Sequence, residues 1–93
     1  MTKVLFSQKA TDRLIQQAQY IFTQTHDVNK ADIFLDTMES YITSSLSSYP
    51  KLGRVAEEHG KNIRKLVYKR YSILYRIDED CIRILTLYRE NLP

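Results

Sequence analysis

The chain has little of what stabilises or targets a secreted protein. Its 93 residues include one cysteine, Cys81, so no disulfide can form within the chain. No two histidines or cysteines lie at metal-ligand spacing, and we expect neither a metal nor a cofactor. The apolar run at residues 3–6 is far too short for a signal peptide or a membrane span. These absences predict a soluble, cytoplasmic protein with no membrane partner.

Glycine and proline are also scarce, with two of each, and no internal repeat is present. Pro50 follows a serine-rich stretch at residues 44–48 and ends the helical pattern of the first half. Gly53 then opens a charged connector that we expect to be irregular. A length of 93 residues predicts a single domain, residues 1–93, with a small core.

The first half of the chain has a short strand pattern followed by two helical patterns. Residues 3–6 predict a strand, after which Ser7 is a candidate N-cap. Apolar residues then recur at three- and four-residue steps as far as Phe22, and the pattern fades at residues 23–26. Asp27 is placed to cap a second helix. Two helices with a short loop between them predict an antiparallel hairpin.

After Gly60 the apolar period changes to two residues. Tyr71, Ile73, Tyr75 and Ile77 alternate with Ser72, Leu74 and Arg76, which predicts a strand with two distinct faces. Polar breaks at residues 69–70 and 78–80 predict turns on either side of it. The predicted fold is α+β in the order β-α-α-β-β-β, with an antiparallel sheet covered on one side by the helical hairpin.

Charge is unevenly distributed along the chain. Residues 1–50 carry four Lys or Arg against five Asp or Glu, a net charge of −1, whereas residues 51–93 carry ten against six, a net charge of +4. Two interpretations are open for this basic half. It is a solvated sheet face, or it is a patch that meets phosphate or an acidic protein segment.

Three stretches carry a resemblance to a known family. They are residues 4–14, with Ser7 and Leu14; residues 49–54, with Tyr-Pro-x-Leu-Gly-Arg; and residues 64–77, with Arg-x-Leu followed by Tyr-x-Ile-x-Tyr-Arg-Ile. In the order and spacing of these three stretches, the chain resembles the ParE/RelE superfamily of bacterial toxin–antitoxin toxins. It resembles ParE more closely than RelE. The resemblance covers almost the whole chain.

A ParE-like toxin of a plasmid-stabilisation module would stall DNA gyrase on broken DNA. The resemblance also implies a cognate antitoxin that neutralises the toxin in a hetero-oligomer. Such a toxin needs a recognition surface more than a catalytic centre, so no catalytic residue is assigned. The residues that we expect to contact the target or nucleic acid are basic or aromatic and lie in the second half: Arg54, Arg64, Lys65, Arg83, Tyr88 and Arg89.

Two alternatives accompany this interpretation. A RelE-like toxin would cleave messenger RNA on the ribosome, but Ser72 stands where such enzymes place a phosphate-binding arginine, and residues 91–93 lack their terminal tyrosine. Tyr88 stands roughly where many relatives carry histidine. The second alternative is a diverged toxin that only binds antitoxin.

Several of these residues also have structural interpretations. Tyr71 and Tyr75 are expected in the core rather than at a base-stacking site. Cys81, at the start of an apolar strand, is expected to be a buried small hydrophobe rather than a nucleophile. Arg64 has two equal interpretations, a basic residue common to the family or an ion-pair partner of Glu57 or Glu58.

Overall fold

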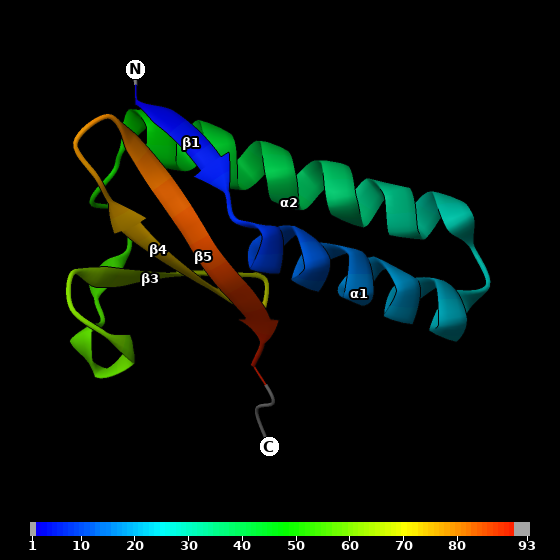
Figure 1. Ribbon diagram of the computed structural model, residues 1–93. Coiled ribbons are helices and arrows are strands. Elements are labelled where there is room, and N and C mark those ends of the chain that lie inside the picture. The colour runs from blue at the N-terminus through cyan, green and yellow to red at the C-terminus, as the bar shows by residue number, and fades with distance from the viewer. Residues whose placement is uncertain (1, 91–93) are drawn as a thin grey trace.

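In the computed structural model, which describes residues 2–90, a helical hairpin packs on one face of a five-stranded sheet (Figure 1). The chain begins at the sheet, runs out and back through the hairpin, and returns to complete the sheet. The elements, in order, are β1 (Lys3–Phe6), α1 (Gln8–Thr25), α2 (Val28–Ser48), β2 (Arg54–Val55), the 3₁₀ helix η1 (Glu57–His59), β3 (Ile63–Tyr68), β4 (Tyr71–Ile77) and β5 (Cys81–Arg89).

The sheet is mixed rather than purely antiparallel. Its strand order is β1-β5-β4-β3-β2, and β1 pairs in parallel with β5, with Val4 opposite Ile82. All other neighbours are antiparallel. The parallel pair arises because the hairpin returns the chain to the end of the sheet where β1 starts. Four strands follow with alternating directions: β2 and β4 run against β1, and β3 and β5 run with it.

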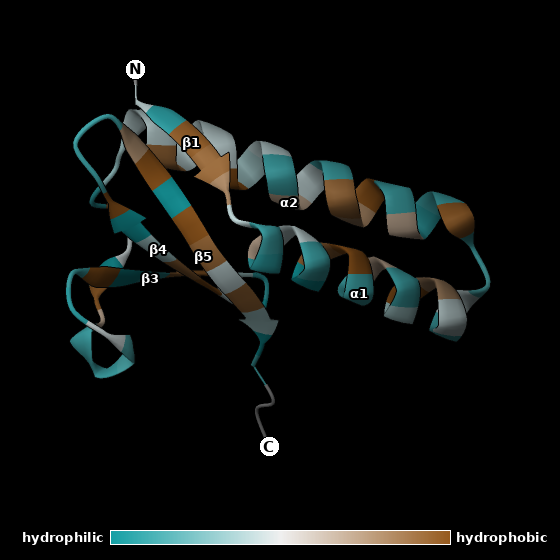
Figure 2. Ribbon diagram, in the orientation of Figure 1, coloured by the Kyte–Doolittle hydropathy of each residue, from teal (hydrophilic) through white to brown (hydrophobic). Residues whose placement is uncertain are grey.

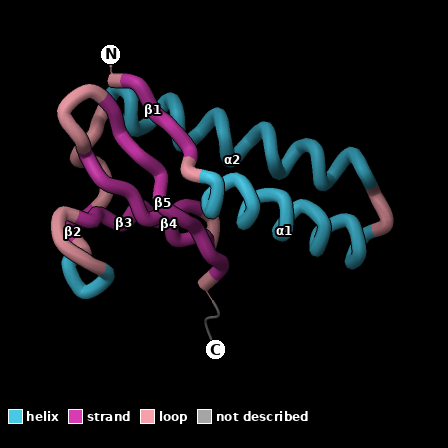
Figure 3. Tube along the Cα trace, in the orientation of Figure 1, coloured by secondary structure: helices cyan, strands magenta, loops and turns pink. Residues whose placement is uncertain are grey.

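The connector after Pro50 is more regular than expected. Arg54 and Val55 form the short edge strand β2, paired with Lys65 and Arg64 of β3, and η1 follows it (Figure 3). The expectation of an irregular connector was therefore wrong. A strand of two residues is too short to show a two-residue period, so the sequence pattern could not reveal it.

The helix boundaries follow the expected capping residues. The Ser7 hydroxyl accepts a hydrogen bond from the Ala10 amide at 3.0 Å and donates one to the carbonyl oxygen of Leu85 at 2.8 Å. Ser7 therefore caps α1, as expected, and ties its start to β5. Asp27 accepts from the Asn29 amide at 2.9 Å and caps α2, while His26 ends α1 in the left-handed conformation.

The core lies between the helical hairpin and the face of the sheet that the hairpin covers. Ile73 and Tyr75 of β4 are fully buried there, Tyr71 packs against them, and Met38 and Ile42 of α2 close the core from above. Cys81 is also buried, at the start of β5. These positions confirm the expected core roles of Tyr71, Tyr75 and Cys81. The opposite side of the sheet carries the buried side chains of Ser72 and Leu74 and is not covered by the hairpin; we call it the open face.

A buried tyrosine joins the connector to the sheet. The Tyr75 hydroxyl donates to the carbonyl oxygen of Pro50 at 2.8 Å and accepts from the Gly53 amide at 2.9 Å. A Cβ atom on Gly53 would lie 2.7 Å from the carbonyl oxygen of Lys65, so only glycine fits against the strand. Arg64 donates to the carbonyl oxygens of Gly53 and Lys51 at 2.9 and 3.3 Å. The connector is therefore held in one conformation at the edge of the sheet.

We expect Tyr75→Phe to lower the free energy of unfolding by about 1–3 kcal/mol, because it leaves the buried Gly53 amide without a hydrogen-bond partner. Chemical denaturation followed by circular dichroism measures this change. Tyr68→Phe is the matched control, since no hydrogen bond of the Tyr68 hydroxyl is found among residues 2–90. Equal free energies of unfolding for the two variants would show that the hydrogen bonds of the Tyr75 hydroxyl do not stabilise the fold.

Candidate functional site

Four of the cations near the open face of the sheet are held in ion pairs. Arg54 lies 2.7 Å from Glu58 and Lys65 lies 2.9 Å from Glu90. Asp78 pairs with both neighbouring arginines, at 2.8 Å from Arg76 and 3.4 Å from Arg83. Much of the basic charge that the sequence places in this half of the chain is therefore balanced within the molecule.

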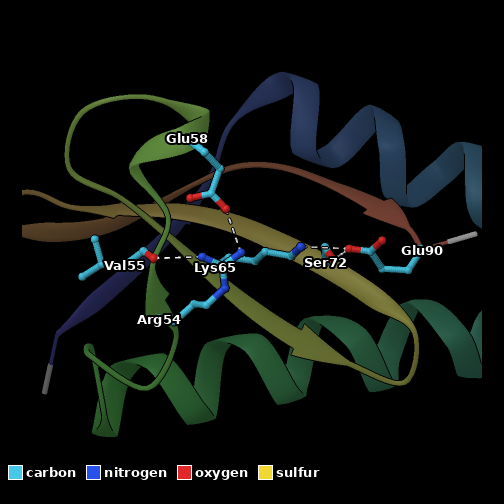
Figure 4. A network of polar contacts seen from close by, with 6 residues as sticks. All are labelled: Arg54, Val55, Glu58, Lys65, Ser72 and Glu90. Carbon is cyan, nitrogen blue, oxygen red and sulfur yellow. Dashed lines mark hydrogen bonds and ion pairs between the residues drawn. The ribbon is translucent and has the colours of Figure 1, made fainter. Parts of the chain in front are cut away.

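Lys65 lies at the centre of the best-developed of these networks (Figure 4). Glu90 accepts hydrogen bonds from the Ser72 hydroxyl and from the Lys65 ammonium group, and the Lys65 nitrogen lies 5.9 Å from the centre of the Tyr88 ring. Hydrogen bonds from Ser72 and then Lys65 lower the pKa of Glu90, and the bond to Glu90 raises the pKa of Lys65. The hydrogen bond with Glu90 therefore favours the protonated, charged form of Lys65.

In the Arg54–Glu58 and Arg76–Asp78 pairs the arginine also lowers the pKa of its carboxylate partner. The hydrogen bond from Arg54 lowers the pKa of Glu58 to about 2, and the hydrogen bond from Arg76 lowers the pKa of Asp78. Both carboxylates are consequently ionised at neutral pH and keep the neighbouring guanidinium groups paired. These pairs are partly exposed, so salt screens them and each contributes little to stability.

A second group of cations has no such partners. Arg13 of α1, Lys69 and Arg70 of the β3–β4 turn, and Arg89 of β5 are exposed, and none lies within 4.0 Å of a carboxylate in the described part of the chain. The turn and the end of β5 are adjacent, because the Glu90 amide donates to the carbonyl oxygen of Arg70 at 2.7 Å. We call these four residues, together with Tyr20, the basic end.

The basic end contains a pocket between α1 and β5. Arg13, Gln17 and Tyr20 line it from the helix, and Tyr88 and Arg89 line it from the strand, around a volume of about 400 Å³. Guanidinium groups beside aromatic rings bind phosphates and carboxylates, because they combine charge, hydrogen-bond donors and a stacking surface. The pocket can therefore hold an acidic side chain or a phosphate group.

The Lys69–Arg70 turn is strained. It connects β3 to β4 through two residues whose φ angles are 49° and 72°, the left-handed combination that Asn-Gly adopts with least strain. A side chain with a Cβ atom destabilises this conformation by about 1–2 kcal/mol per residue. The chain nevertheless presents two long basic side chains there, beside Arg89.

The structure divides the six residues that the sequence singled out. Arg89 lies at the basic end, and Tyr88 adjoins the pocket there although its ring lies on the open face, 5.9 Å from the Lys65 nitrogen. Arg54, Lys65 and Arg83 are in ion pairs. Arg64 holds the connector through backbone carbonyl groups. It pairs with neither Glu57 nor Glu58 among residues 2–90, which contradicts the ion-pair interpretation, one of the two that were open.

Sequence reasoning overlooked Arg13, Lys69 and Arg70. The spacing of the strands marked residues 69–70 as a turn, and a two-residue turn with no glycine or asparagine was an available signal of strain. Arg13 had no comparable signal, because its approach to Arg89 depends on how α1 packs against β5.

Side chains of His, Cys, Asp and Glu among residues 2–90 form no group of three that could hold a metal ion. Neither helix of the described chain combines the length and apolar character needed to cross a membrane.

Comparisons with known proteins identify the family. A family model described as the ParE toxin of the type II toxin–antitoxin system parDE matches residues 4–90. A chain of the chromosomal ParDE toxin–antitoxin system from P. aeruginosa has a TM-score of 0.76 at 19% identity, with 98% of each chain covered. A chain of the RelBE2 toxin–antitoxin complex from Mycobacterium tuberculosis has a TM-score of 0.69 at 20% identity, covering 96% of this chain and 91% of that one. A search of curated protein sequences found no match.

We expect the Lys65–Glu90 pair to make stability depend on pH. The pKa of Glu90 is lowered by folding, so its contribution is present above the unfolded value of about 4.3 and is lost as pH falls through the lower folded value. Glu90→Gln should lower the melting temperature at pH 7 and leave a shallower decline below about pH 4.3 than the wild type shows.

Melting curves between neutral and acid pH measure this difference. Glu79→Gln is the control, an exposed carboxylate in the β4–β5 turn with no ion pair among residues 2–90. If Glu90→Gln melts like the wild type at pH 7, the ion pair does not stabilise the fold.

Proposed function

The chain belongs to the ParE family of toxins from type II toxin–antitoxin systems, and on this premise we propose that it inhibits DNA gyrase through its basic end and is neutralised by a cognate antitoxin. It acts by binding rather than by catalysis. The observation that carries the proposal is the contrast between the paired cations of the open face and the unpaired cations of the basic end.

This contrast matters because a binding surface needs charges that are free to meet a partner. A cation already paired with a carboxylate must break that pair before it binds another anion, which weakens its net contribution. Arg13, Lys69, Arg70 and Arg89 have no such pair among residues 2–90. They can contact acidic side chains of gyrase or the phosphates of the DNA that gyrase holds.

Messenger-RNA cleavage is less well supported by the open face. In-line attack of a 2′-hydroxyl needs a base, a cation at the scissile phosphate and an acid for the leaving oxygen. Lys65 is protonated and paired, and Ser72 donates its hydroxyl hydrogen to Glu90. The expectation about a terminal tyrosine concerns residues 91–93, which lie outside the described residues.

The antitoxin is proposed to cover the same basic end. An acidic antitoxin segment in the pocket of Arg13, Tyr88 and Arg89 would compete directly with gyrase or its DNA. Complex formation would also stabilise the toxin, because the antitoxin binds the folded chain and not the unfolded one. Neutralisation would then need no change in the fold of the toxin. A chain that bound antitoxin but never inhibited gyrase would be the diverged toxin of the second alternative.

Charge reversal at the basic end tests the proposal. We expect Arg89→Glu to raise the concentration needed for half-inhibition of gyrase supercoiling by about 10-fold or more, the loss of one charge-assisted contact. Lys61→Glu makes the same charge change at an exposed site in the loop before β3, and it should inhibit like the wild type. Linear DNA should accumulate with the wild type and disappear when antitoxin is added.

Two results would contradict the proposal. One is an Arg89→Glu variant that inhibits gyrase as well as the Lys61→Glu control does. The other is cleavage of ribosome-bound messenger RNA by the wild type without any effect on gyrase, which would transfer the function to the open face.

The strained turn offers a second test, in which stability and activity should change in opposite directions. Lys69→Asn with Arg70→Gly relieves the left-handed strain and should raise the free energy of unfolding by about 1–3 kcal/mol. The same variant removes two cations of the basic end, so its inhibition of gyrase should fall. A variant that is both more stable and fully inhibitory would show that the turn takes no part in target binding.

A further inference from the structure

Polar side chains from three neighbouring strands share a small area of the open face. Ser72 of β4 lies opposite Tyr88 of β5 in the strand register, and Lys65 of β3 lies opposite Leu74 of β4. Alternate residues of a strand point to the same face, so Ser72 and Leu74 place the side chains of their partners on one side of the sheet. Figure 4 shows the Lys65 side chain extended along this face towards Ser72 and Glu90.

Two of these side chains donate to a single oxygen atom. The Ser72 hydroxyl and the Lys65 ammonium group both donate to Oε1 of Glu90, the ammonium group at 2.9 Å. Ser72 is fully buried, and the side chains of Lys65 and Glu90 are 15% and 29% exposed. The two donors are therefore fixed by the surrounding packing, and they define a position for one anionic oxygen.

The other carboxylates in ion pairs of the open face have no comparable site. Glu58 pairs with Arg54 at side-chain exposures of 54% and 56%, and Asp78 bonds only to partly exposed arginines. Among the ion pairs of residues 2–90, a fully buried donor thus contributes only to the one that contains Glu90. The position filled by its carboxylate is a built anion site and not a surface contact.

The surroundings of this position can contact more than one oxygen atom. The Lys65 nitrogen lies 5.9 Å from the centre of the Tyr88 ring, and that ring lies 6.4 Å from the ring of His59 in η1. Figure 2 shows η1 and the end of β5 as hydrophilic segments. Hydroxyl, ammonium and imidazole groups all donate hydrogen bonds to phosphate oxygens. A phosphate group presents more oxygens than a carboxylate, so it suits this set of donors better.

Glu90 reaches the site with its side chain alone. Its backbone amide is held separately, by the hydrogen bond to the carbonyl oxygen of Arg70 at 2.7 Å. Rotation about the side-chain bonds of Glu90 therefore removes the carboxylate without unpairing β5. That rotation leaves Lys65 and Ser72 without an anionic partner, which is unfavourable unless another anion takes the position.

We propose that Ser72, Lys65 and Tyr88 form a phosphate-binding site on the open face, and that the Glu90 carboxylate occupies this site as an internal competitor. The ligand is a phosphate group, either free or part of a nucleic acid backbone. Glu90 is thus a specificity-determining residue, because it makes the open face a weak binder of phosphate. One consequence rests on the proposed function, namely that phosphates of gyrase-bound DNA are left to the basic end. The site is assigned binding and no cleavage.

Removal of the internal competitor is the direct test. We expect Glu90→Ala to bind inorganic phosphate at least about 10-fold more tightly than the wild type, as measured on the full chain by NMR shifts of the Lys65 and Ser72 amides. Glu79→Ala removes the same charge from the β4–β5 turn and should bind phosphate like the wild type. Glu90→Gln removes the charge with a similar shape, and it replaces Glu90→Ala if circular dichroism shows that the latter is unfolded.

Double variants locate the site. The gain in affinity should disappear when Glu90→Ala is combined with Ser72→Ala or with Lys65→Met. Lys61→Met is the matched control for the lysine, since Lys61 is exposed in the loop before β3, and its combination with Glu90→Ala should keep the gain.

A short single-stranded oligonucleotide distinguishes the two sources of phosphate. If the site takes nucleic acid, the oligonucleotide should bind Glu90→Ala more tightly than inorganic phosphate does, because a base stacks on Tyr88. Adding Tyr88→Leu should then weaken the oligonucleotide and leave inorganic phosphate unaffected. If the site takes free phosphate, the oligonucleotide should bind no more tightly at an equal concentration of phosphate groups. Both results support the site and identify its ligand.

Three outcomes would overturn the inference. They are equal phosphate affinity of Glu90→Ala and Glu79→Ala, retention of the gain by both double variants of the site, and tighter binding of acetate than of phosphate by Glu90→Ala. None of these measurements involves gyrase or Arg89. A toxin without effect on gyrase, whose Glu90→Ala variant gains phosphate binding, would remove the gyrase proposal and keep the site.

Discussion

The buried hydroxyl of Tyr75 is the interaction on which the arrangement of this molecule depends. It joins Pro50 and Gly53, at the exit of the hairpin, to the middle of the sheet. With the connector fixed there, β2 pairs with β3, and Arg54 reaches Glu58. The other ion pairs of the open face lie on β3, β4, β5 and their adjoining turns, which are held in register by their own backbone pairing. The Tyr75 hydroxyl therefore positions the edge of the sheet and, with it, the Arg54–Glu58 pair.

Ion pairing distinguishes the open face from the basic end, although the composition alone indicates a single basic half of the chain. The open face holds its cations in pairs with Glu58, Asp78 and Glu90. The basic end instead presents Arg13 and Arg89 without such partners among residues 2–90, beside a turn that is strained by two basic residues. This distribution suits a small toxin that must recognise a target and an antitoxin with one short chain.

Local signals in the sequence predicted the helices and the covered face of the sheet. Ser7 and Asp27 mark where the helices begin, and the alternation from Tyr71 to Ile77 separates the two faces of β4. Pairings between segments that are distant in the sequence could not be predicted. The parallel pairing of β1 with β5 depends on how the hairpin returns the chain, and β2 is too short to show a period. The partners of Lys65 and Arg83 depend on strand register, so their pairing could not be read from the order of residues.

Hydrogen–deuterium exchange of the toxin, alone and bound to gyrase, tests the separation of the two surfaces most directly. The account predicts slower exchange in gyrase-bound toxin at residues 69–70 and 86–90, with exchange along the outer face of the hairpin unchanged. Bound antitoxin should slow exchange at the same residues, because it is proposed to cover the basic end. Protection of the hairpin by gyrase, with the end of β5 unaffected, would contradict the account and place target recognition on the hairpin.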